Sequence, residues 1–255
     1  MNENKKDFEI KIDDARYWKD CIGAINNLID EGLFNITKEG ISLKAMDNSG
    51  IGMVSFFMPN KEFSRYSIDK SSSIGINLDN LSKIMNSYRS NEELTMKDDG
   101  NKLSIEFSGR NSKRRYKLPI IDIKKDSKEP NVQFDSFVEV KCDLLKKILK
   151  DAGMFSSYIT LKTDKGTFKV DTKGDAGELE EEYLDTAELI KKLEVNIPSS
   201  SSFNLEFLGK MIDSCPSNAN IQLSLKSGEP LKIDYEIGDA KVSYYLAPYM
   251  EDKSD

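Results

Sequence analysis

A nine-residue pattern that occurs twice is the strongest constraint on how this chain can fold. The first copy is Ile76–Ile84 and the second is Phe203–Met211. Both copies read apolar, Asn-Leu, acidic, any residue, Leu, small, Lys, apolar, and they lie about 127 positions apart. Leu94–Lys97 returns as Ile221–Ser224 at the same offset. A period this long predicts two tandem copies of one domain rather than a solenoid of short units.

Two other pairs of segments keep nearly the same offset. Thr37–Ile41 returns as Thr163–Thr167, and Tyr116–Pro119 returns as Tyr244–Ala247. Order, spacing and apolar pattern therefore agree across most of both halves. The alternative is a pair of unrelated α+β halves with a similar rhythm of helices and strands.

Length and charge limit the class of protein. The 255 residues suffice for two domains that each bury a core. The formal net charge of -7 argues against bulk attraction to nucleic acid, although it leaves room for a local basic face. No apolar run approaches the ~20 residues that span a bilayer, and Met1–Asp7 lacks the apolar core of a signal peptide. We therefore do not expect the protein to associate with a membrane.

The side chains best suited to catalysis are missing or scattered. Histidine, the commonest acid–base catalyst and metal ligand, is absent. The cysteines are read as reduced core thiols, and they are Cys21, Cys142 and Cys215. We expect no catalytic residue, no metal site and no cofactor. The enzymatic alternative is a metal-dependent hydrolase that uses the clustered carboxylates Asp171, Asp175 and Glu178.

Apolar residues at helical spacing predict two helices in each half. Asp13-Asp14 can cap a helix that runs to about Asp30, with Gly32 just beyond it. A counterpart runs from about Asp143 to Ala152, and each copy of the nine-residue pattern opens another helix. Several cations lie off the apolar stripes: Arg16, Lys19, Lys83, Lys146, Lys150 and Lys210. Lysines spaced over one surface favour phosphate contact without base readout.

Between the helices, short alternating runs with close turns predict antiparallel strands. In the first half these are Leu33–Thr37, Ile41–Met46, Met53–Phe57, Leu94–Lys97, Leu103–Phe107 and Arg115–Ile120. In the second half they are Tyr158–Thr163, Thr167–Asp171, Leu179–Leu184, Leu193–Ile197, Ile221–Leu225, Leu231–Tyr235 and Ala240–Leu246. The expected fold class is α+β, with two tandem domains that each pack two helices on antiparallel sheets.

Two charged runs stand out among these strands. Lys113–Lys117 is basic and Glu178–Tyr183 is acidic. They can be solvated edge strands whose charge prevents aggregation. Alternatively they pair between molecules, because an edge strand with unpaired backbone groups is a template for strand addition. A chain that carries both runs can join copies of itself head to tail and close into a ring.

Three motifs give the chain a family resemblance. They are Leu43–Asp47, Gly75–Leu78 with Leu81–Ile84, and Tyr244–Pro248 followed by Glu251-Asp252. On these residues the chain resembles the archaeal and eukaryotic DNA sliding clamp, proliferating cell nuclear antigen, over nearly its whole length. The resemblance implies a non-enzymatic polymerase processivity factor: a pseudo-sixfold ring of three chains whose helices face double-stranded DNA without sequence preference.

The resemblance also assigns residues to surfaces. The subunit interface would pair Lys113, Arg114, Arg115, Tyr116, Lys117 and Leu118 with Glu178, Leu179, Glu180, Glu181, Glu182 and Tyr183. The DNA-facing residues would be Arg16, Lys19, Lys83, Lys146, Lys150 and Lys210. Client peptides, often with a glutamine and two aromatics, would dock at Met46, Ile51, Met53, Pro230, Tyr245, Leu246, Ala247, Pro248 and Met250. The implied partners are the replicative polymerase, the clamp loader, flap endonuclease and DNA ligase.

The expected organisation is a domain at 1–123, a polar linker at 124–133, a domain at 134–250 and a flexible tail at 251–255. The sequence departs from the family at Asp126–Glu129, which replaces apolar linker residues, and at Gly50 and Tyr249. These departures leave client choice open. A specialised subunit of a heterotrimeric or checkpoint-type clamp is the alternative within the same class. The expected location is cytoplasmic and nucleoid-associated in an archaeon, or nuclear in a eukaryote.

Overall fold

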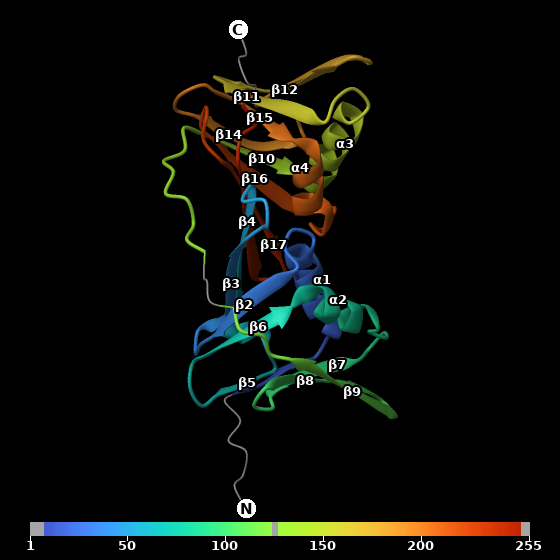
Figure 1. Cartoon of the computed structure of the whole chain (residues 1–255). Coiled ribbons are helices and arrows are strands. Elements are labelled where there is room, and N and C mark those ends of the chain that lie inside the picture. The colour runs from blue at the N-terminus through green and yellow to red at the C-terminus, as the bar shows by residue number, and fades with distance from the viewer. Residues whose placement is uncertain (1–7, 124–126, 251–255) are drawn as a thin grey trace, which may run out of the picture. The chain divides into compact units, whose positions relative to one another are not determined.

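The computed structural model describes residues 8–123 and 127–250, which form two compact units (Figure 1). The first unit is built from residues 8–48, 54–123, 127–128 and 237–242. The second is built from residues 49–53, 129–236 and 243–250. Part of the expected linker, 124–126, and the expected tail, 251–255, lie outside the described residues. No helix within the described ranges is long and apolar enough to cross a membrane.

The described part of the first half of the chain forms two α-helices and nine strands. Its elements are β1 (Phe8–Ile12), α1 (Ala15–Asn26), β2 (Glu31–Ile36), β3 (Gly40–Met46), β4 (Gly52–Pro59), a 3-10 turn (Asn60–Glu62), β5 (Arg65–Ile68), β6 (Ser72–Asn77), α2 (Leu78–Asn86), β7 (Glu93–Asp98), β8 (Lys102–Gly109) and β9 (Ser112–Pro119). β1, β5 and β6 were not expected from the sequence.

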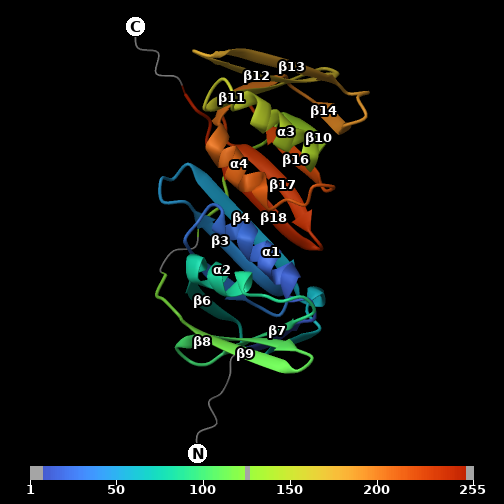
Figure 2. The same ribbon diagram turned by 90° about the vertical axis from the view of Figure 1, so that its right-hand side faces the viewer.

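The second half repeats this organisation. Its elements are β10 (Ser136–Lys141), α3 (Cys142–Ala152), β11 (Tyr158–Asp164), β12 (Thr167–Gly174), β13 (Gly177–Leu184), β14 (Ile190–Val195), β15 (Ser199–Asn204), α4 (Leu205–Asp213), β16 (Asn220–Leu225), β17 (Leu231–Ile237) and β18 (Ala240–Leu246). Within each half the two helices lie side by side in both views, α1 with α2 and α3 with α4 (Figures 1 and 2).

The strands pair in antiparallel order. One sheet of the first half runs β5-β1-β7-β8-β9, and β4-β3-β2-β6 are neighbours in another. In the second half one sheet runs β13-β12-β11-β15, and β14-β10-β16-β17-β18 are neighbours. Ile10 lies opposite Met96, which in turn lies opposite Ile105, so apolar residues share one face across three strands. This alternation buries one face of each sheet.

The duplication recurs in the backbone hydrogen bonds. Ala15 donates its N–H to the carbonyl of Glu92 at 3.0 Å, and Cys142 donates to Ala219 at 3.0 Å. A second matching pair joins Leu78 to Asp30 and Leu205 to Ser157. Both pairs keep an offset of 127, the offset of the nine-residue pattern. The two halves are therefore copies of one fold, as the sequence predicts.

Helix capping explains why both copies of the nine-residue pattern carry Asn at their second position. The Asn77 side-chain oxygen accepts the N–H of Asn80 at 2.9 Å, and that of Asn204 accepts the N–H groups of Glu206 and Phe207. An Asn at this place satisfies a helix N–H that has no carbonyl partner, and replacing it by Ala costs about 1 kcal/mol. The pattern thus marks the first turn of α2 and of α4.

The first helix ends earlier than predicted. α1 stops at Asn26, with Asn27 as its C-cap, and not at about Asp30. Gly32 lies inside β2, where an added Cβ would come within 2.4 Å of Leu43 Cδ1. The glycine therefore permits close packing against Leu43 and does not end the helix, which is why the capping rule failed here.

Candidate functional site

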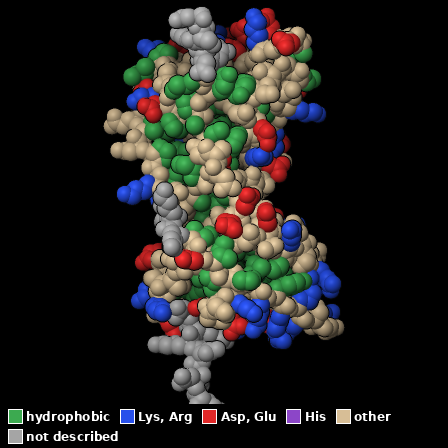
Figure 3. Space-filling view, in the orientation of Figure 1, with side chains coloured by type: hydrophobic (Ala, Val, Ile, Leu, Met, Phe, Trp, Pro, Cys, Tyr) green, Lys and Arg blue, Asp and Glu red, His purple; other side chains and the backbone are tan. Residues whose placement is uncertain are grey.

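Both charged runs lie on edge strands. β9 ends one sheet of the first half and β13 ends one sheet of the second half, so each has a strand neighbour on one side only. The free side of such a strand presents backbone N–H and C=O groups that a further strand can bind. Lys and Arg side chains gather over β7 to β9 in the space-filling view (Figure 3). The geometry therefore permits strand addition at either edge.

Side chains of β9 alternate between two faces because a strand repeats every two residues. Lys113, Arg115 and Lys117 are exposed, whereas Arg114 and Tyr116 are half-buried. Leu118 is buried at 8% exposure. Three of the four cations in the basic run therefore face outward, and Arg114 does not.

The outward cations of β9 already have acidic neighbours. Arg115 Nε donates to Glu106 Oε2 at 2.5 Å, and Lys113 Nζ lies 3.5 Å from the other oxygen of Glu106. Lys117 Nζ lies 2.5 Å from Asp99. The hydrogen bond from Arg115 holds the pKa of the Glu106 carboxyl below its ordinary value. One carboxylate thus serves two cations, and the strand keeps an excess of positive charge.

β13 has the opposite balance. Glu182 accepts from Lys169 at 2.6 Å, and Glu178 lies 3.6 Å from Lys173. The hydrogen bond to Glu182 raises the pKa of Lys169 above its ordinary value. On the half-buried face, Tyr183 donates to Glu181. Four glutamates share two lysines on β12, so the acidic strand keeps an excess of negative charge.

The candidate DNA-facing cations differ in their exposure and in whether they form ion pairs. Lys83 on α2 and Lys150 on α3 are exposed and form no ion pair within the described part of the chain. Arg16 lies 3.6 Å from Asp14, an exposed pair at the start of α1. Lys19 is half-buried. Among the candidate residues, Lys83 and Lys150 therefore offer the most available positive charge.

The other two helix lysines have partners. Lys146 Nζ donates to the backbone carbonyls of Asp213 and Cys215 at 2.9 and 3.0 Å, which ties α3 to the end of α4. Lys210 lies 2.7 Å from Glu206, one turn earlier on α4. Both cations are therefore already engaged within the fold, which sequence spacing alone did not show.

The candidate client surface of the second unit mixes exposed and buried residues. Ile51 is 40% exposed, and its carbonyl accepts the N–H of Ala247 at 2.9 Å. Met53 and Leu246 are 1% and 0% exposed, so they support this surface from below and do not line it. Pro230 and Pro248 are half-buried, and Met250 is exposed.

Tyr245 anchors this surface through its polar end. Only 6% of the residue is exposed, and its hydroxyl donates to Glu129 Oε2 at 2.8 Å. Lys232 Nζ lies 5.9 Å from the centre of its ring. Burial, assisted by the bond to Glu129, raises the pKa of Tyr245. Glu129 and Lys232 were not among the residues predicted from the sequence, because neither pairing follows from local spacing.

Met46 lies in the first unit, at the end of β3, and is 47% exposed. It lines a hollow of about 230 Å³ together with Ile29, Asp30, Glu31, Asp47 and Asn48. Three of these six side chains are carboxylates. The hollow therefore combines an apolar contact with a negative rim.

Tyr249, one of the positions where the resemblance implies a departure from the family, is held by contacts within the fold. Its N–H donates to the Ser202 carbonyl at 2.7 Å, beside the edge strand β15. Its ring stacks on Tyr158 with the centres 3.8 Å apart. The stacking fixes the chain just after Pro248, so the carboxyl-terminal part of the client surface is held in place.

The carboxylates of the enzymatic alternative are not arranged as a site. Asp171 pairs with Lys162, and Glu178 pairs with Lys173. Among the described residues, no group of three His, Cys, Asp or Glu side chains could hold a metal ion. These contacts give the hydrolase alternative no support.

Two tandem α+β domains with charged edge strands and cationic helices define the class of two-domain clamp proteins. Family models agree with this class on both halves. The proliferating cell nuclear antigen N-terminal domain matches residues 7–129, and the C-terminal domain of the same family matches residues 128–250. The chain therefore belongs to the proliferating cell nuclear antigen family, a family of DNA polymerase sliding clamps and not of enzymes.

Individual relatives cover nearly the whole chain. A DNA polymerase sliding clamp from Thermococcus gammatolerans is 33% identical over 248 residues, 96% of this chain and 99% of the relative. One from Methanococcus vannielii is 33% identical over 243 residues, 93% and 97% of the two chains.

Solved structures show the same fold. The proliferating cell nuclear antigen of Thermococcus kodakaraensis superimposes with a TM-score of 0.90 at 24% identity, covering 95% of this chain and 100% of that one. The protein from Entamoeba histolytica gives 0.88 at 26% identity, covering 96% and 100%. The resemblance and the fold class that the sequence motifs implied are confirmed.

Proposed function

We propose that three copies of this chain close into a ring around duplex DNA and hold replication enzymes there. The observation that carries this proposal is the pair of oppositely charged edge strands, β9 and β13, in one chain. Because the two edges are different surfaces, each copy can donate one and accept the other. Such head-to-tail contacts form a ring when the rotation between copies closes.

The proposed subunit contact joins the free backbone edges of β9 and β13. Main-chain hydrogen bonds supply its regular part, and half-buried Tyr116, Leu179 and Tyr183 supply apolar area. Outward Arg115 and Glu180 set the register and exclude like-charged partners. Exposed ion pairs of this kind contribute only about 0–1 kcal/mol each. Shape and backbone pairing therefore provide most of the affinity.

The proposed DNA contact is weak and independent of sequence. Lys83 and Lys150, which have no acidic partner within the described residues, would contact phosphates, with Arg16, Lys19, Lys146 and Lys210 adding smaller contributions. Phosphate contacts exchange counterions without reading bases. A closed ring stays on DNA because of its topology, so weak contacts are sufficient and permit sliding.

The proposed clients are a DNA polymerase, the clamp loader, flap endonuclease and DNA ligase. They would dock a short peptide on the surface formed by Ile51, Pro230, Tyr245, Ala247 and Pro248. Met250, which is 71% exposed, suits a surface that adapts to several partners. This chain would then contribute by tethering these enzymes to DNA, and not by catalysis. It would act while bound around the DNA.

A topological assay tests this function. The chain is loaded by its own clamp loader onto a nicked circular plasmid, and DNA-bound protein is separated by gel filtration. We expect the protein to stay with the circle and to dissociate after a single cut linearises the DNA. Equal dissociation from circular and linear DNA would refute the ring. If loading requires sister subunits, the heterotrimeric alternative is supported instead.

A further inference from the structure

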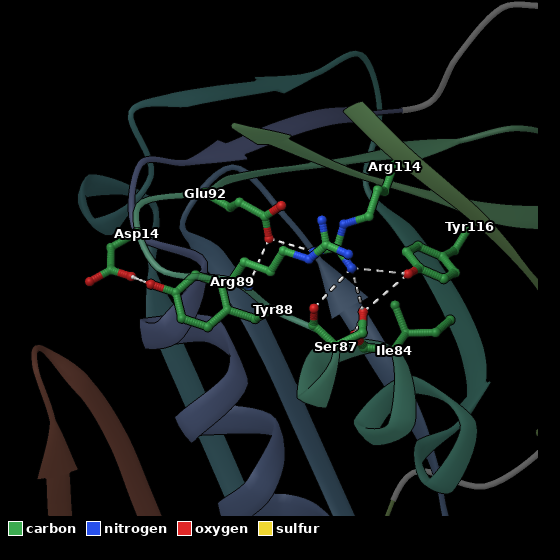
Figure 4. A network of polar contacts seen from close by, with 8 residues as sticks. All are labelled: Asp14, Ile84, Ser87, Tyr88, Arg89, Glu92, Arg114 and Tyr116. Carbon is green, nitrogen blue, oxygen red and sulfur yellow. Dashed lines mark hydrogen bonds and ion pairs between the residues drawn. The ribbon is translucent and has the colours of Figure 1, made fainter. Parts of the chain in front are cut away.

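Arg114 points into the first unit, away from the free edge of its own strand β9. Its Nη2 donates to Glu92 Oε2 at 2.5 Å, and Glu92 is only 3% exposed. Its Nη1 donates to the Ser87 carbonyl at 2.9 Å and lies 3.3 Å from the Tyr116 hydroxyl. The guanidinium also lies over the Phe107 ring, 5.0 Å from its centre. Figure 4 shows it held between Glu92 and Ser87.

The contacts of Arg114 converge on the end of α2. Ser87 is the C-cap of that helix, and its hydroxyl donates to the Ile84 carbonyl at 2.7 Å. A cation is favoured at a helix C-terminus, where the last carbonyls have no intrahelical donor. Glu92 also accepts the backbone N–H of Arg89 at 2.8 Å. One side chain thus fastens β9 both to the helix end and to the loop that follows it.

The second half of the chain provides an internal comparison. Ser214, the C-cap of α4, has the same backbone angles as Ser87, φ −80 and ψ −3. Ala219 stands at the place of Glu92, and Val242 stands at the place of Arg114 when Tyr116 is aligned with Tyr244. The equivalent helix end has no ion pair among the described residues, although the Lys146 ammonium donates to the backbone carbonyls of Asp213 and Cys215 there. Tyr235 donates to the Met211 carbonyl at 3.1 Å and lies 3.3 Å from the Tyr244 hydroxyl.

The fold therefore does not require an ion pair at this place. The pair occurs in the half whose corresponding strand, β9, is a sheet edge. An edge strand has one hydrogen-bonded neighbour and frays more readily than an inner strand, so ordering it costs entropy when a partner binds. An anchor on its inner face removes part of that cost before association.

We propose that Arg114 is a positioning residue for self-association, which holds the edge of β9 ready for a partner strand without touching that partner. This inference rests on the proposed ring and refines its interface. The interface assigned by family resemblance counts Arg114 among the pairing residues. The geometry instead gives the outward role to Lys113, Arg115 and Lys117, and the ordering role to Arg114.

The test separates positioning from mere stability. Arg114→Met alone leaves the Glu92 charge buried and unpaired, so it is expected to destabilise the domain as well as the ring. The double variant Glu92→Met with Arg114→Met removes both charges and fills similar volume, a change that often restores stability. Thermal unfolding of both variants and of the wild type establishes whether it does.

Two readouts then decide the proposal. We expect the double variant to unfold near the wild-type temperature, yet to show a trimer dissociation constant raised at least tenfold. At concentrations where the chain is monomeric, the amides of residues 112–119 should exchange with deuterium faster than in the wild type. Wild-type association and wild-type exchange in a stable double variant would overturn the proposal.

The same experiment distinguishes this proposal from the proposed ring. A wild-type chain that stays monomeric at tens of micromolar would contradict self-association through β9. Faster exchange at β9 in the double variant would still support an ordering role for Arg114 in that case. Unchanged exchange would contradict it.

Discussion

The hydroxyl of Tyr245 donates a 2.8 Å hydrogen bond to the carboxylate of Glu129, 116 positions earlier in the chain. The bond ties the connector that precedes β10 to a buried residue of the candidate client surface. Burial raises the pKa of Tyr245 further above physiological pH, so its hydroxyl is a neutral donor there. The connector thus has a fixed point in the second unit.

Loss of that fixed point should weaken client binding. Glu129→Ala removes one hydrogen bond to a charged acceptor, a contribution of about 1.5–3 kcal/mol when intact. Part of it is recovered by water, so we expect a three- to tenfold higher dissociation constant for a peptide with a glutamine and two aromatics. Lys128→Ala, the exposed neighbour, serves as the control. An unchanged affinity for Glu129→Ala in a calorimetric titration would remove Glu129 from the site.

Charge reversal at the outward face of β9 should weaken self-association. Arg115→Glu places a negative charge opposite the acidic strand, and we expect at least a tenfold higher trimer dissociation constant, measured by light scattering on dilution. Arg65→Glu, on the opposite edge strand of the same sheet, is the matched control. Adding Glu180→Arg to Arg115→Glu should recover part of the affinity. A fully trimeric Arg115→Glu variant would show that β9 does not form the contact.

The pair between Arg115 and Glu106 should give a specific acid sensitivity. Because the folded-state pKa of Glu106 is lowered from 4.5, its contribution to stability is present above pH 4.5 and is lost as the pH falls through the lowered value. Glu106→Gln should therefore unfold below the wild-type temperature at pH 7, and the difference should shrink as the pH falls below 4.5. A difference that stays constant over this range would contradict the assignment.

DNA binding should depend most on Lys83 and Lys150, the exposed candidate lysines without an ion pair among the described residues. Lys83→Ala or Lys150→Ala should each reduce the slope of log K against log salt by about 0.9 for each phosphate that the variant no longer neutralises. Lys210→Ala should have a smaller effect, because Glu206 already offsets that charge. Fluorescence anisotropy with a short duplex at several salt concentrations measures the slopes. If all three variants kept the wild-type slope, these helices would not face DNA.

Much of the fold could be predicted because its signals are local. Asn77 and Asn204 each cap a helix through side-chain bonds spanning two or three residues, so the repeated pattern marks two helix starts directly. The runs of like charge along β9 and β13 likewise indicated edge strands, and both strands are sheet edges. These features depend on residues within one turn or one strand.

Other elements depend on distant partners and were missed. β15, Ser199–Asn204, has few apolar residues. It pairs with β11, and the Ser202 hydroxyl lies 2.8 Å from that of Thr160. Four consecutive serines give no strand signal by themselves, so its existence follows only from the tertiary pairing. Tertiary context can override local propensity in this way.

The candidate surfaces also combine features that local sequence predicts with features that depend on distant residues. The sequence indicated which segments were basic, yet it could not show that Arg114 turns inward to Glu92, because that pairing spans 22 positions. Nor could it show that Leu246, part of the family motif Tyr244–Pro248, is completely buried. A motif identifies residues that a family needs, whereas burial decides which of them a partner can touch.

The central claim is that this chain assembles with copies of itself through β9 and β13. Sedimentation equilibrium of the purified chain at micromolar concentration tests it directly. The account predicts a mass three times the 28.9 kDa of one chain. A stable mass of 28.9 kDa under the same conditions would contradict it.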